Sequence, residues 1–562
     1  MVRNYIKIAW RNLQKSKGTS SINIAGLASG IAVVLLIGLW IQDELTFDQF
    51  TPTYDRVAQV HTNQIDNNGE IYTGQSQSIP AIRYIRDNFQ AEFEYVSLTS
   101  WNYQHLLDHE DTRIIKNGMY VEPAFPSIFG LDFIHGNQKQ SLTEPYSIIL
   151  NESLAKALFG EVDPIGKIIR FDTTHDLEVT GVFKDFPHNS SLKDAHYFVT
   201  WEYYGIAHEW LKQSEDNWAN HSFQGFVLLQ EGVDVATASE RIKDVEKGRF
   251  SYGDPELLLH EMRNWHLRNN FKDGAVAGGR IQFVWMFGII GVFVLILACI
   301  NFMNLSTARS ERRAKEVGIR KTVGSGRGQL IGQFLTESIL IATISMMIGL
   351  LIIELAILPF NELADKEIAI PWSSPIFYSG LVSFTLIVGL LAGSYPAFFL
   401  SAFRPIRALR GVSNKKGISS LPRRILVTLQ FTVSVALIIG TLVVFKQIQF
   451  AKDRPIGYDY KNTIYFFDNM EIKYKYDLMR NDLLNSGLVE AFSHSNAPVT
   501  NIWSNNIDFK WEGKDPDQII SFGTVAISHD YGKSVGWEII EGRDLDRNLQ
   551  TDSLAMILNQ SA

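Results

Sequence analysis

The sequence contains a single cysteine, Cys299, among 562 residues. One cysteine excludes a disulfide framework and a zinc site built from cysteines. Positive charge is not in excess either, because 52 Lys and Arg stand against 60 Asp and Glu, giving a net charge of −8. A slightly acidic chain argues against a nucleic-acid-binding protein. Global disorder is excluded as well, since only 20% of the residues are charged and 35 are Phe.

Motifs of common catalytic sites are missing or lack their context. A His-Glu-x-x-His zinc motif does not occur, and the Gly-x-Ser-x-Gly sequence at Gly532 to Gly536 does not directly follow a strand-like run, as a nucleophile elbow would. The nearest approach to a phosphate-binding loop, Gly160 to Lys167, has one intervening residue too many and is followed by Ile168. His105 and His109 have the spacing of some zinc-binding pairs, but their acidic neighbours indicate a solvated loop. These absences predict a chain that is not an enzyme and binds no metal or cofactor itself.

The most prominent feature of the sequence is a set of long uncharged stretches. Five of them are long enough to cross the roughly 30 Å hydrocarbon core of a membrane as helices. They are residues 21–42, 281–308, 338–353 (extending back to Gln329), 376–400 and 425–445. Buried core helices are the alternative, but helices in globular proteins rarely run 20 residues without a charge. The sequence therefore predicts a multi-pass α-helical membrane protein.

The distribution of basic residues predicts how the spans are oriented. Segments 1–30, 306–332 and 401–424 together hold 19 Lys and Arg but only two acidic residues. Such segments stay on the cytoplasmic side of a membrane. We therefore expect the cytoplasmic (inner) membrane as the location, with the N-terminus in the cytoplasm and residues 43–280 and 446–562 outside.

The remaining segments follow from this layout. Residues 1–20 place apolar side chains at helical spacing among basic ones, which predicts a cytoplasmic amphipathic helix at the inner interface. Residues 43–280 are too long for a loop and predict a folded domain. It alternates β-rich runs with helical runs, which indicates an α+β fold. The β-rich runs include 57–60, 146–150, 177–183 and 226–230, and the helical runs include 153–159 and 235–247. Residues 404–424 form a cytoplasmic linker.

Two short windows of the sequence each occur a second time, in the same order. Residues 129–136 resemble 535–542, and the two pairs of glycines are each 406 positions apart. Further on, 149–153 resemble 557–561 in the same order. The repeat predicts that 446–562 is the start of a second, incomplete outside domain, and that the chain is truncated before further spans.

A basic segment, 309–332, lies between the second and third spans. Its motif is Glu311-Arg312-Arg313, Glu316-Val-Gly-Ile-Arg-Lys-Thr-Val-Gly-Ser, then Gln329 and Glu337. This motif closely resembles the cytoplasmic motif of MacB/FtsX-type ABC transporter permeases. Three further stretches resemble the same family in the same order: 158–167, 179–187 and 393–410.

The resemblance implies a fold and a function. It implies a MacB-like periplasmic core domain after the first span and an FtsX-like core over 281–403, in a form with two repeats. It implies a permease without its own ATPase, which transmits the motion of a separate cytoplasmic ABC ATPase to its outside domains. The cargo would be a peptide, a lipoprotein or a hydrophobic toxin that is exported or extracted.

The resemblance also implies partners and a docking site. The partner ATPase would hold ATP and magnesium, and the lipid bilayer surrounds the spans. A second permease half or a second copy, and a periplasmic adaptor, are further partners of this type. The residues expected to couple to the ATPase are Glu311, Arg312, Glu316, Gly318, Arg320, Lys321, Gly324, Gln329 and Glu337. A helix is expected to run to about Lys321, with Gly324, Gly326 and Gly328 as a flexible corner.

One alternative function stays open. FtsX-like relatives can act as a transmembrane signal relay that activates a cell-wall hydrolase without transport. The two-repeat layout favours a transporter, because relatives of the relay type have four spans and a smaller outside domain.

Overall fold

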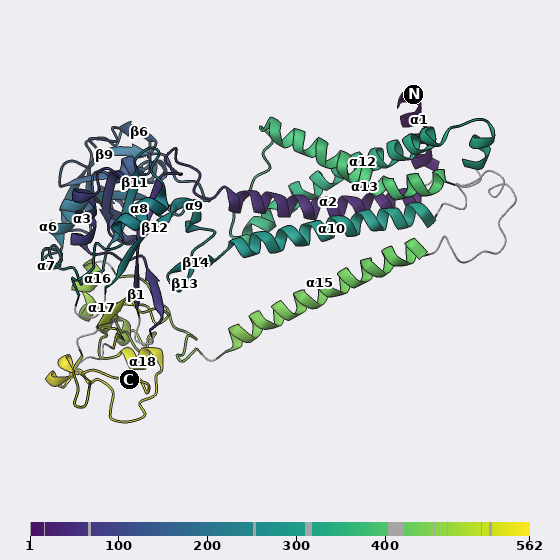
Figure 1. The fold of residues 1–562 in the computed structure, drawn as a ribbon. Coiled ribbons are helices and arrows are strands. Elements are labelled where there is room, and N and C mark those ends of the chain that lie inside the picture. Colours follow the sequence, from purple (N-terminus) through teal and green to yellow (C-terminus); the bar gives the residue numbers. More distant parts are fainter. Residues whose placement is uncertain are drawn as a thin grey trace. The chain divides into compact units, whose positions relative to one another are not determined.

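The protein is described from a computed structural model, which divides it into two compact units (Figure 1). Residues 2–15, 17–65, 69–250, 254–308, 317–402, 421–454, 456–468, 470–506, 509–515 and 520–562 are described. The helical unit comprises Met1–Thr46 and Arg280–Asp453, and the sheet unit comprises Phe47–Gly279 and Arg454–Ala562. The boundaries lie within a few residues of the predicted domain 43–280, because the first spanning helix continues beyond residue 42.

The helical unit is built from long apolar helices. Its helices are α1 (Val2–Lys15), α2 (Lys17–Leu45), α10 (Ile281–Ala308), α12 (Arg327–Ala364), α13 (Pro375–Ser401) and α15 (Leu421–Asp453). Five of these, all but α1, are long and apolar enough to cross a membrane, which confirms the predicted number of spans. The third span is longer than predicted, because α12 runs for 38 residues and takes in the polar residues that flank its apolar centre.

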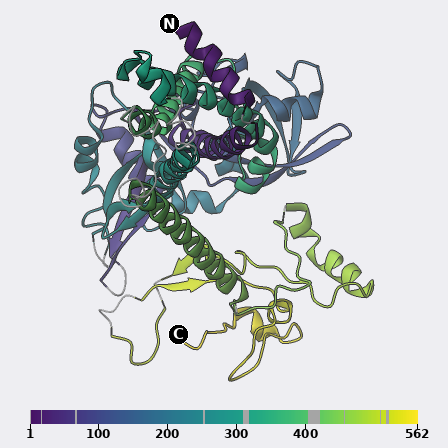
Figure 2. The ribbon, with the colours of Figure 1, turned by 90° about the vertical axis from the view of Figure 1, so that its right-hand side faces the viewer.

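Four of the spans pack around a shared core. Helices α2, α10, α12 and α13 contact one another, and Figure 2 shows the same helices gathered when the view is turned. Buried core residues include Leu27, Ile31, Phe302, Ala342 and Val388. The fifth span, α15, contacts α10, where Asn304 Nδ2 donates to Gln430 Oε1 at 3.4 Å.

Glycines allow these helices to approach closely. A Cβ added to Gly30 of α2 would lie 2.6 Å from Cβ of Ala298 in α10. A Cβ added to Gly389 of α13 would lie 2.9 Å from Cα of Ile339, and one on Gly393 would lie 2.6 Å from Cβ of Ser338. Small residues four apart let neighbouring backbones approach and gain van der Waals contact in a membrane. The unit is therefore held together by close backbone contacts at two helix crossings.

The sheet unit contains a 12-stranded mixed sheet. Ten strands follow the order β10-β7-β9-β8-β4-β5-β3-β11-β1-β12, with β2 paired to β1 and β6 to β9. The strands are β1 (Val57–Ile65), β2 (Ile71–Gly74), β3 (Phe93–Thr99), β4 (Tyr103–His109), β5 (Thr112–Val121), β6 (Phe133–Gly136), β7 (Ser147–Asn151), β8 (Ile168–Phe171), β9 (His175–Phe183), β10 (Tyr197–Thr200), β11 (Gln224–Leu229) and β12 (Glu256–Glu261). A separate hairpin, β13 (Asn270–Lys272) and β14 (Ala275–Gly278), precedes α10.

Helices and connections accompany this sheet. The helices are α3 (Ile79–Asn88), α4 (Phe125–Ile128), α5 (Glu152–Phe159), α6 (Trp201–Ala207), α7 (Trp210–Ser214), α8 (Val235–Ile242) and α9 (Met262–Trp265). Side chains alternate along a strand, so Ile148 and Leu150 of β7 enter one core while Ile149 enters another. A strand that is buried on both faces explains the three consecutive apolar residues Ile148–Leu150 in the β-rich run at 146–150. The α+β prediction is confirmed, and the runs at 57–60, 177–183 and 226–230 are the strands β1, β9 and β11.

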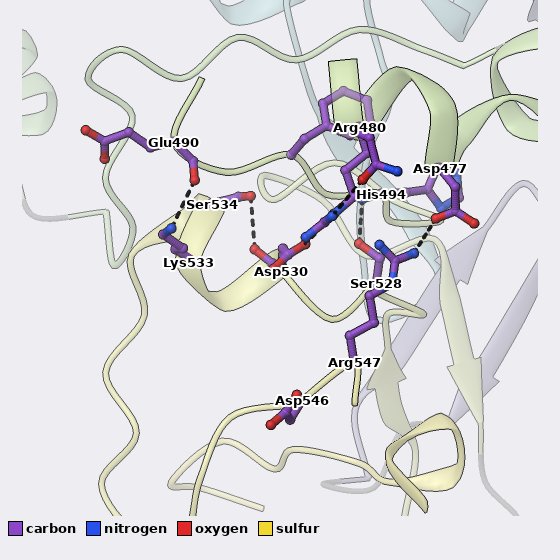
Figure 3. A network of polar contacts seen from close by, with 12 residues as sticks. Asp477, Arg480, Glu490, His494, Ser528, Asp530, Lys533, Ser534, Asp546 and Arg547 are labelled. Carbon is purple, nitrogen blue, oxygen red and sulfur yellow. Dashed lines mark hydrogen bonds and ion pairs between the residues drawn. The ribbon is translucent and has the colours of Figure 1, made fainter. Parts of the chain in front are cut away.

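Residues 454–562 have less regular structure. They contain α16 (Met470–Tyr474), α17 (Tyr476–Asn485), β15 (Ser504–Asn506), β16 (Phe522–Thr524), α18 (Tyr531–Val535) and the 3₁₀ helix η1 (Gln550–Leu554). Polar contacts hold this segment together (Figure 3): Arg480 Nε donates to Asp530 Oδ2 at 2.7 Å, and Arg547 pairs with Asp477. Lys533 Nζ donates to the carbonyl oxygen of Glu490 at 3.0 Å.

The sequence repeat has a structural counterpart. A short helix precedes each copy, α4 in the first and α18 in the second. The first glycines, Gly130 and Gly536, have φ of 55° and 70°, and the second, Gly136 and Gly542, have φ of 86° and 90°. Residues with a side chain rarely adopt such positive φ angles, and this explains why both copies have glycine at both positions. The short helix and the two positive-φ glycines therefore recur in both copies, whereas the strand β6 of the first copy has no counterpart at residues 539–542.

Candidate coupling site

The described part of the coupling segment is a short helical stretch followed by a tight corner. Residues 317–322 are helical, and Gly324 has φ of 100°. The corner is closed by a hydrogen bond from the amide of Ser325 to the carbonyl of Arg320 at 3.0 Å. Helix α12 then begins at Arg327, with Gly326 at its N-cap and the Gln329 side chain accepting from the Gly326 amide at 3.2 Å. Gly328 lies inside α12, so the flexible corner is shorter than predicted.

Arg320 and Lys321 contact the protein's own helices. Arg320 Nη1 donates to Oε1 of Gln333 in α12 at 2.8 Å. Lys321 Nζ donates to the carbonyl oxygen of Ser401, the last residue of α13, at 2.7 Å. A lysine at a helix C-terminus is stabilised by the unpaired carbonyls and the helix dipole there. These two predicted coupling residues therefore hold the corner against α12 and α13.

Apolar packing fixes the same corner. Val317 is 2% exposed and packs in a cluster with Leu330 and Phe334 of α12 and with Ala397 and Leu400 of α13. The corner is thus anchored by the buried side chain of Val317 and by the hydrogen bonds of Arg320 and Lys321. Such a rigid element can pass a displacement to the helices that it contacts.

Two of the exposed side chains at this corner are apolar. Ile319 is 48% exposed and Val323 is 83% exposed. Val323 directly follows the helical stretch and its amide donates to the Ile319 carbonyl at 3.1 Å, so the two residues are one helical turn apart on the same side. We call these two residues the exposed apolar pair. Sequence reasoning concentrated on the charges and missed this pair, although its i, i+4 spacing was available as a signal.

The remaining predicted coupling residues fall into two groups. Gly318 is buried, and Gly324 and Gln329 lie at the corner. Glu311, Arg312 and Glu316 lie outside the described residues.

Glu337 lies inside the helical unit. Its side chain is 7% exposed, and its Oε2 accepts from Asn12 Nδ2 of α1 at 3.4 Å. With Asn23 and Ser338 it lines a cavity of about 30 Å³ where α2, α10, α12 and α13 meet. That volume holds about one water molecule. Glu337 therefore lies buried within the helix packing, whereas the other described residues of the predicted coupling site lie at or next to the corner.

The described residues of the chain contain no cluster of three His, Cys, Asp or Glu side chains suited to a metal ion. His105 Nδ1 lies 2.6 Å from Oδ2 of Asp172, and His109 Nδ1 lies 2.9 Å from the carbonyl oxygen of Ile168. The two histidines have separate partners.

Comparison with protein-family models identifies both parts of the chain. The MacB-like periplasmic core domain matches residues 20–245, and the FtsX-like permease C-terminal domain matches residues 288–413. The first match begins at the first span and covers most of the domain after it, and the second match covers the next three spans. The chain belongs to the family of MacB/FtsX-type ABC transporter permeases. It is accordingly a multi-pass membrane protein with a MacB-like domain inserted after its first span.

Individual relatives agree with this family. The ABC transporter permease YknZ of Bacillus subtilis is 24% identical over 285 residues, which cover 50% of this chain and 63% of YknZ. The macrolide export ATP-binding/permease protein MacB of Neisseria meningitidis is 25% identical over 264 residues, covering 47% of this chain and 38% of MacB. The chain thus matches less than two thirds of the length of each of these relatives.

Solved structures also align with part of this chain. The periplasmic region of MacB from Actinobacillus actinomycetemcomitans aligns with 38% of this chain and 91% of its own length, at 14% identity and a TM-score of 0.28. The extracellular domain of YknZ aligns with 36% of this chain and 99% of its own length, at 12% identity and a TM-score of 0.27.

Proposed function

We propose that this permease transmits the ATP-driven motion of a separate cytoplasmic ABC ATPase to its MacB-like domain, and thereby exports or extracts a peptide, lipoprotein or hydrophobic toxin. The ATPase would bind ATP and magnesium, since this sequence has no phosphate-binding loop. The basic segments support an N-terminus and a coupling segment in the cytoplasm, with the MacB-like domain beyond the inner membrane. A second permease half or a second copy, and a periplasmic adaptor, complete the proposed assembly.

The observation that carries this proposal is the exposed apolar pair on a rigidly anchored corner. A partner protein that covers Ile319 and Val323 would remove their apolar surface from water, which is favourable. Arg320 and Lys321 prevent the corner from yielding when a partner pushes on it, because each is hydrogen-bonded to a different spanning helix. We therefore assign docking to Ile319 and Val323, and bracing to Arg320 and Lys321.

A pull-down of the intact protein tests the docking assignment. The affinity-tagged protein is solubilised gently, and copurifying nucleotide-binding proteins are identified by mass spectrometry. We expect an ABC ATPase with the wild type and its loss with I319D/V323D, because two carboxylates cannot enter an apolar groove without large desolvation cost. V276D changes a valine of β14 that is 44% exposed, and serves as the matched control. The proposal is wrong if no ATPase copurifies with wild type in several detergents.

Changing Arg320 and Lys321 tests the bracing assignment and should give a different result. The variant R320A/K321A should still bind the ATPase, because the exposed apolar pair is retained. ATP-dependent changes in the MacB-like domain should then weaken, as the corner is no longer fixed to α12 and α13. Copurification of a cell-wall hydrolase in place of an ATPase would instead support the signal-relay function.

A further inference from the structure

The chain passes between the helical unit and the MacB-like domain at the end of α2 and again at the start of α10. These two connections differ in their local chemistry. The α2 connection carries three acidic residues within six positions, Asp43, Glu44 and Asp48. The α10 connection carries two adjacent glycines, Gly278 and Gly279.

The acidic residues on the helical side are held by one lysine. Lys366 Nζ lies 2.7 Å from Oδ2 of Asp43 and 2.7 Å from Oε1 of Glu44. The Lys366 side chain is 8% exposed, and the side chains of Asp43 and Glu44 are 17% and 1% exposed. Charged hydrogen bonds shielded from water are stronger than those on a surface. The end of α2 is therefore fixed to the segment between α12 and α13.

That segment is itself held in one conformation. Lys366 follows Asp365, which ends α12 in the left-handed conformation with φ of 50°. Asn361 of α12 pins the chain further on, since its Nδ2 donates to the Ile368 carbonyl at 2.9 Å and its Oδ1 accepts from the Ile368 amide at 3.1 Å. The lysine is thus presented by a rigid turn at the end of the helix whose other end carries the coupling corner.

The acidic residue on the sheet side is anchored as well. Asp48 is fully buried, and its carboxylate accepts from the amide of Ser191 at 2.6 Å and from the Ser191 hydroxyl at 2.7 Å. The amide of Asp48 donates to the carbonyl of Asn189 at 2.9 Å. The chain leaving α2 is therefore tied into the MacB-like domain two residues after it enters the sheet unit.

The α10 connection is held differently: its glycines carry no side chain that could form a charged link, and Gly278 pairs with Asn270 within the β13–β14 hairpin. Gly278 and Gly279 have φ of 137° and 141°, in the region that favours glycine. A Cβ on Gly279 would lie 2.8 Å from the carbonyl oxygen of Leu267. Adjacent glycines absorb changes in φ and ψ at low cost, which is the property of a hinge.

We propose that Lys366 is a positioning residue that couples α12 to α2, so that motion reaches the MacB-like domain through α2 while the Gly278–Gly279 connection follows passively. This inference rests on the proposed function, because it assigns the route of the transmitted motion. Displacement of the coupling corner moves α12, the Lys366 link carries α2 with it, and the Asp48 anchor passes the motion into the sheet unit.

Reversible cross-linking tests the link in one protein sample. Glu44 and Lys366 are changed to Cys in a C299A background, and a short thiol-specific cross-linker that reductant removes joins them. The variant is reconstituted with the partner ATPase, and two quantities are measured: the ATPase rate and the ATP-dependent change in hydrogen exchange over residues 47–279. The ATPase rate reports the docking site, and the exchange reports the transmitted motion.

We expect the variant without cross-linker to hydrolyse ATP within about twofold of the C299A parent and to lose most of the exchange response. The cross-linker should restore the response, and reductant should remove it again. K366R, which keeps the charge, should retain the response, and K272M, on the exposed β13, is the matched control for loss of a lysine.

Two results overturn the inference. One is a full exchange response in the variant without cross-linker, and the other is a lost response that cross-linking does not restore. Failure of the proposed function looks different, since the C299A parent itself would then bind no ATPase and show no ATP-dependent change.

Discussion

His61 of β1 and His260 of β12 lie beside each other on neighbouring strands, with their ring centroids 5.0 Å apart. Their residues are 2% and 4% exposed. Burial lowers the pKa of His61 to about 3, with the nearby His260 adding to the effect, and burial lowers the pKa of His260 to about 4. Both rings also contact Phe271 of β13. The pair is therefore neutral at pH 7 and joins the sheet to the hairpin before α10.

This pair predicts acid sensitivity of the MacB-like domain. In the unfolded chain both histidines take up protons near pH 6.5, whereas in the folded chain they do so only near pH 3 to 4. Folding stability is therefore lost as the pH falls below about 6.5, by up to about 2 kcal/mol per histidine at pH 5. Hydrogen exchange of the β1 and β12 amides, corrected for its intrinsic pH dependence, should rise between pH 7 and pH 5.

Two variants separate this effect from general acid denaturation. H61Q/H260Q should flatten the pH dependence in β1 and β12, while H135Q, at an exposed position of β6, should leave it unchanged. An unaltered pH dependence in H61Q/H260Q would show that other groups are responsible.

At the same scale, the sequence predicts a coupling segment but does not reveal the contacts that its side chains make within the chain. The family resemblance implies that Arg320 and Lys321 couple to a partner ATPase. Their actual acceptors, Gln333 and the Ser401 carbonyl, are 13 and 80 positions away in the chain. Only the packing of α12 and α13 brings those acceptors within reach, so no local pattern reveals them.

Helices α12 and α13 cross where Gly389 and Gly393 remove the side chains from one face of α13. Replacing Gly389 by Leu should force the helices apart, because a Cβ alone would lie 2.9 Å from the Ile339 backbone. Overpacking of this kind costs about 1–3 kcal/mol. Thermal unfolding in detergent should show a lowered midpoint for G389L. G380L, at a glycine of the same helix with open space around it, should have a much smaller effect, and equal midpoints would contradict the close-crossing account.

The spans could be predicted from the sequence, and the sheet could not. A run such as 281–308 has only one stable arrangement in lipid, since every backbone group must be bonded within the segment. The order of strands in a sheet has no such constraint. Strand β10 pairs with β5, which ends 76 residues earlier, and with β7, which ends 46 residues earlier. Only tertiary contacts select these partners. The runs at 57–60 and 146–150 therefore revealed strands without revealing their neighbours.

For the molecule as a whole, the distribution of basic residues predicts a fixed orientation in the membrane. In a C299A background, K139C places a thiol at an exposed position of the MacB-like domain, and V323C places one in the exposed apolar pair. A membrane-impermeant maleimide added to intact spheroplasts should label K139C and leave V323C unlabelled. V323C should become labelled once the membrane is permeabilised. Labelling of V323C in intact spheroplasts would reverse the orientation and place the coupling corner on the wrong side for an ATPase.

Helices α2 and α10 pack directly against each other, and the first 233 residues of the sheet unit, Phe47–Gly279, lie between them in the sequence. The MacB-like domain is therefore a cassette inserted into a helical hairpin that closes without it. Selection can then exchange or reshape the cassette while the helical hairpin stays as it is. Laboratory chimaeras that join a foreign ectodomain between Thr46 and Arg280 would exploit the same freedom.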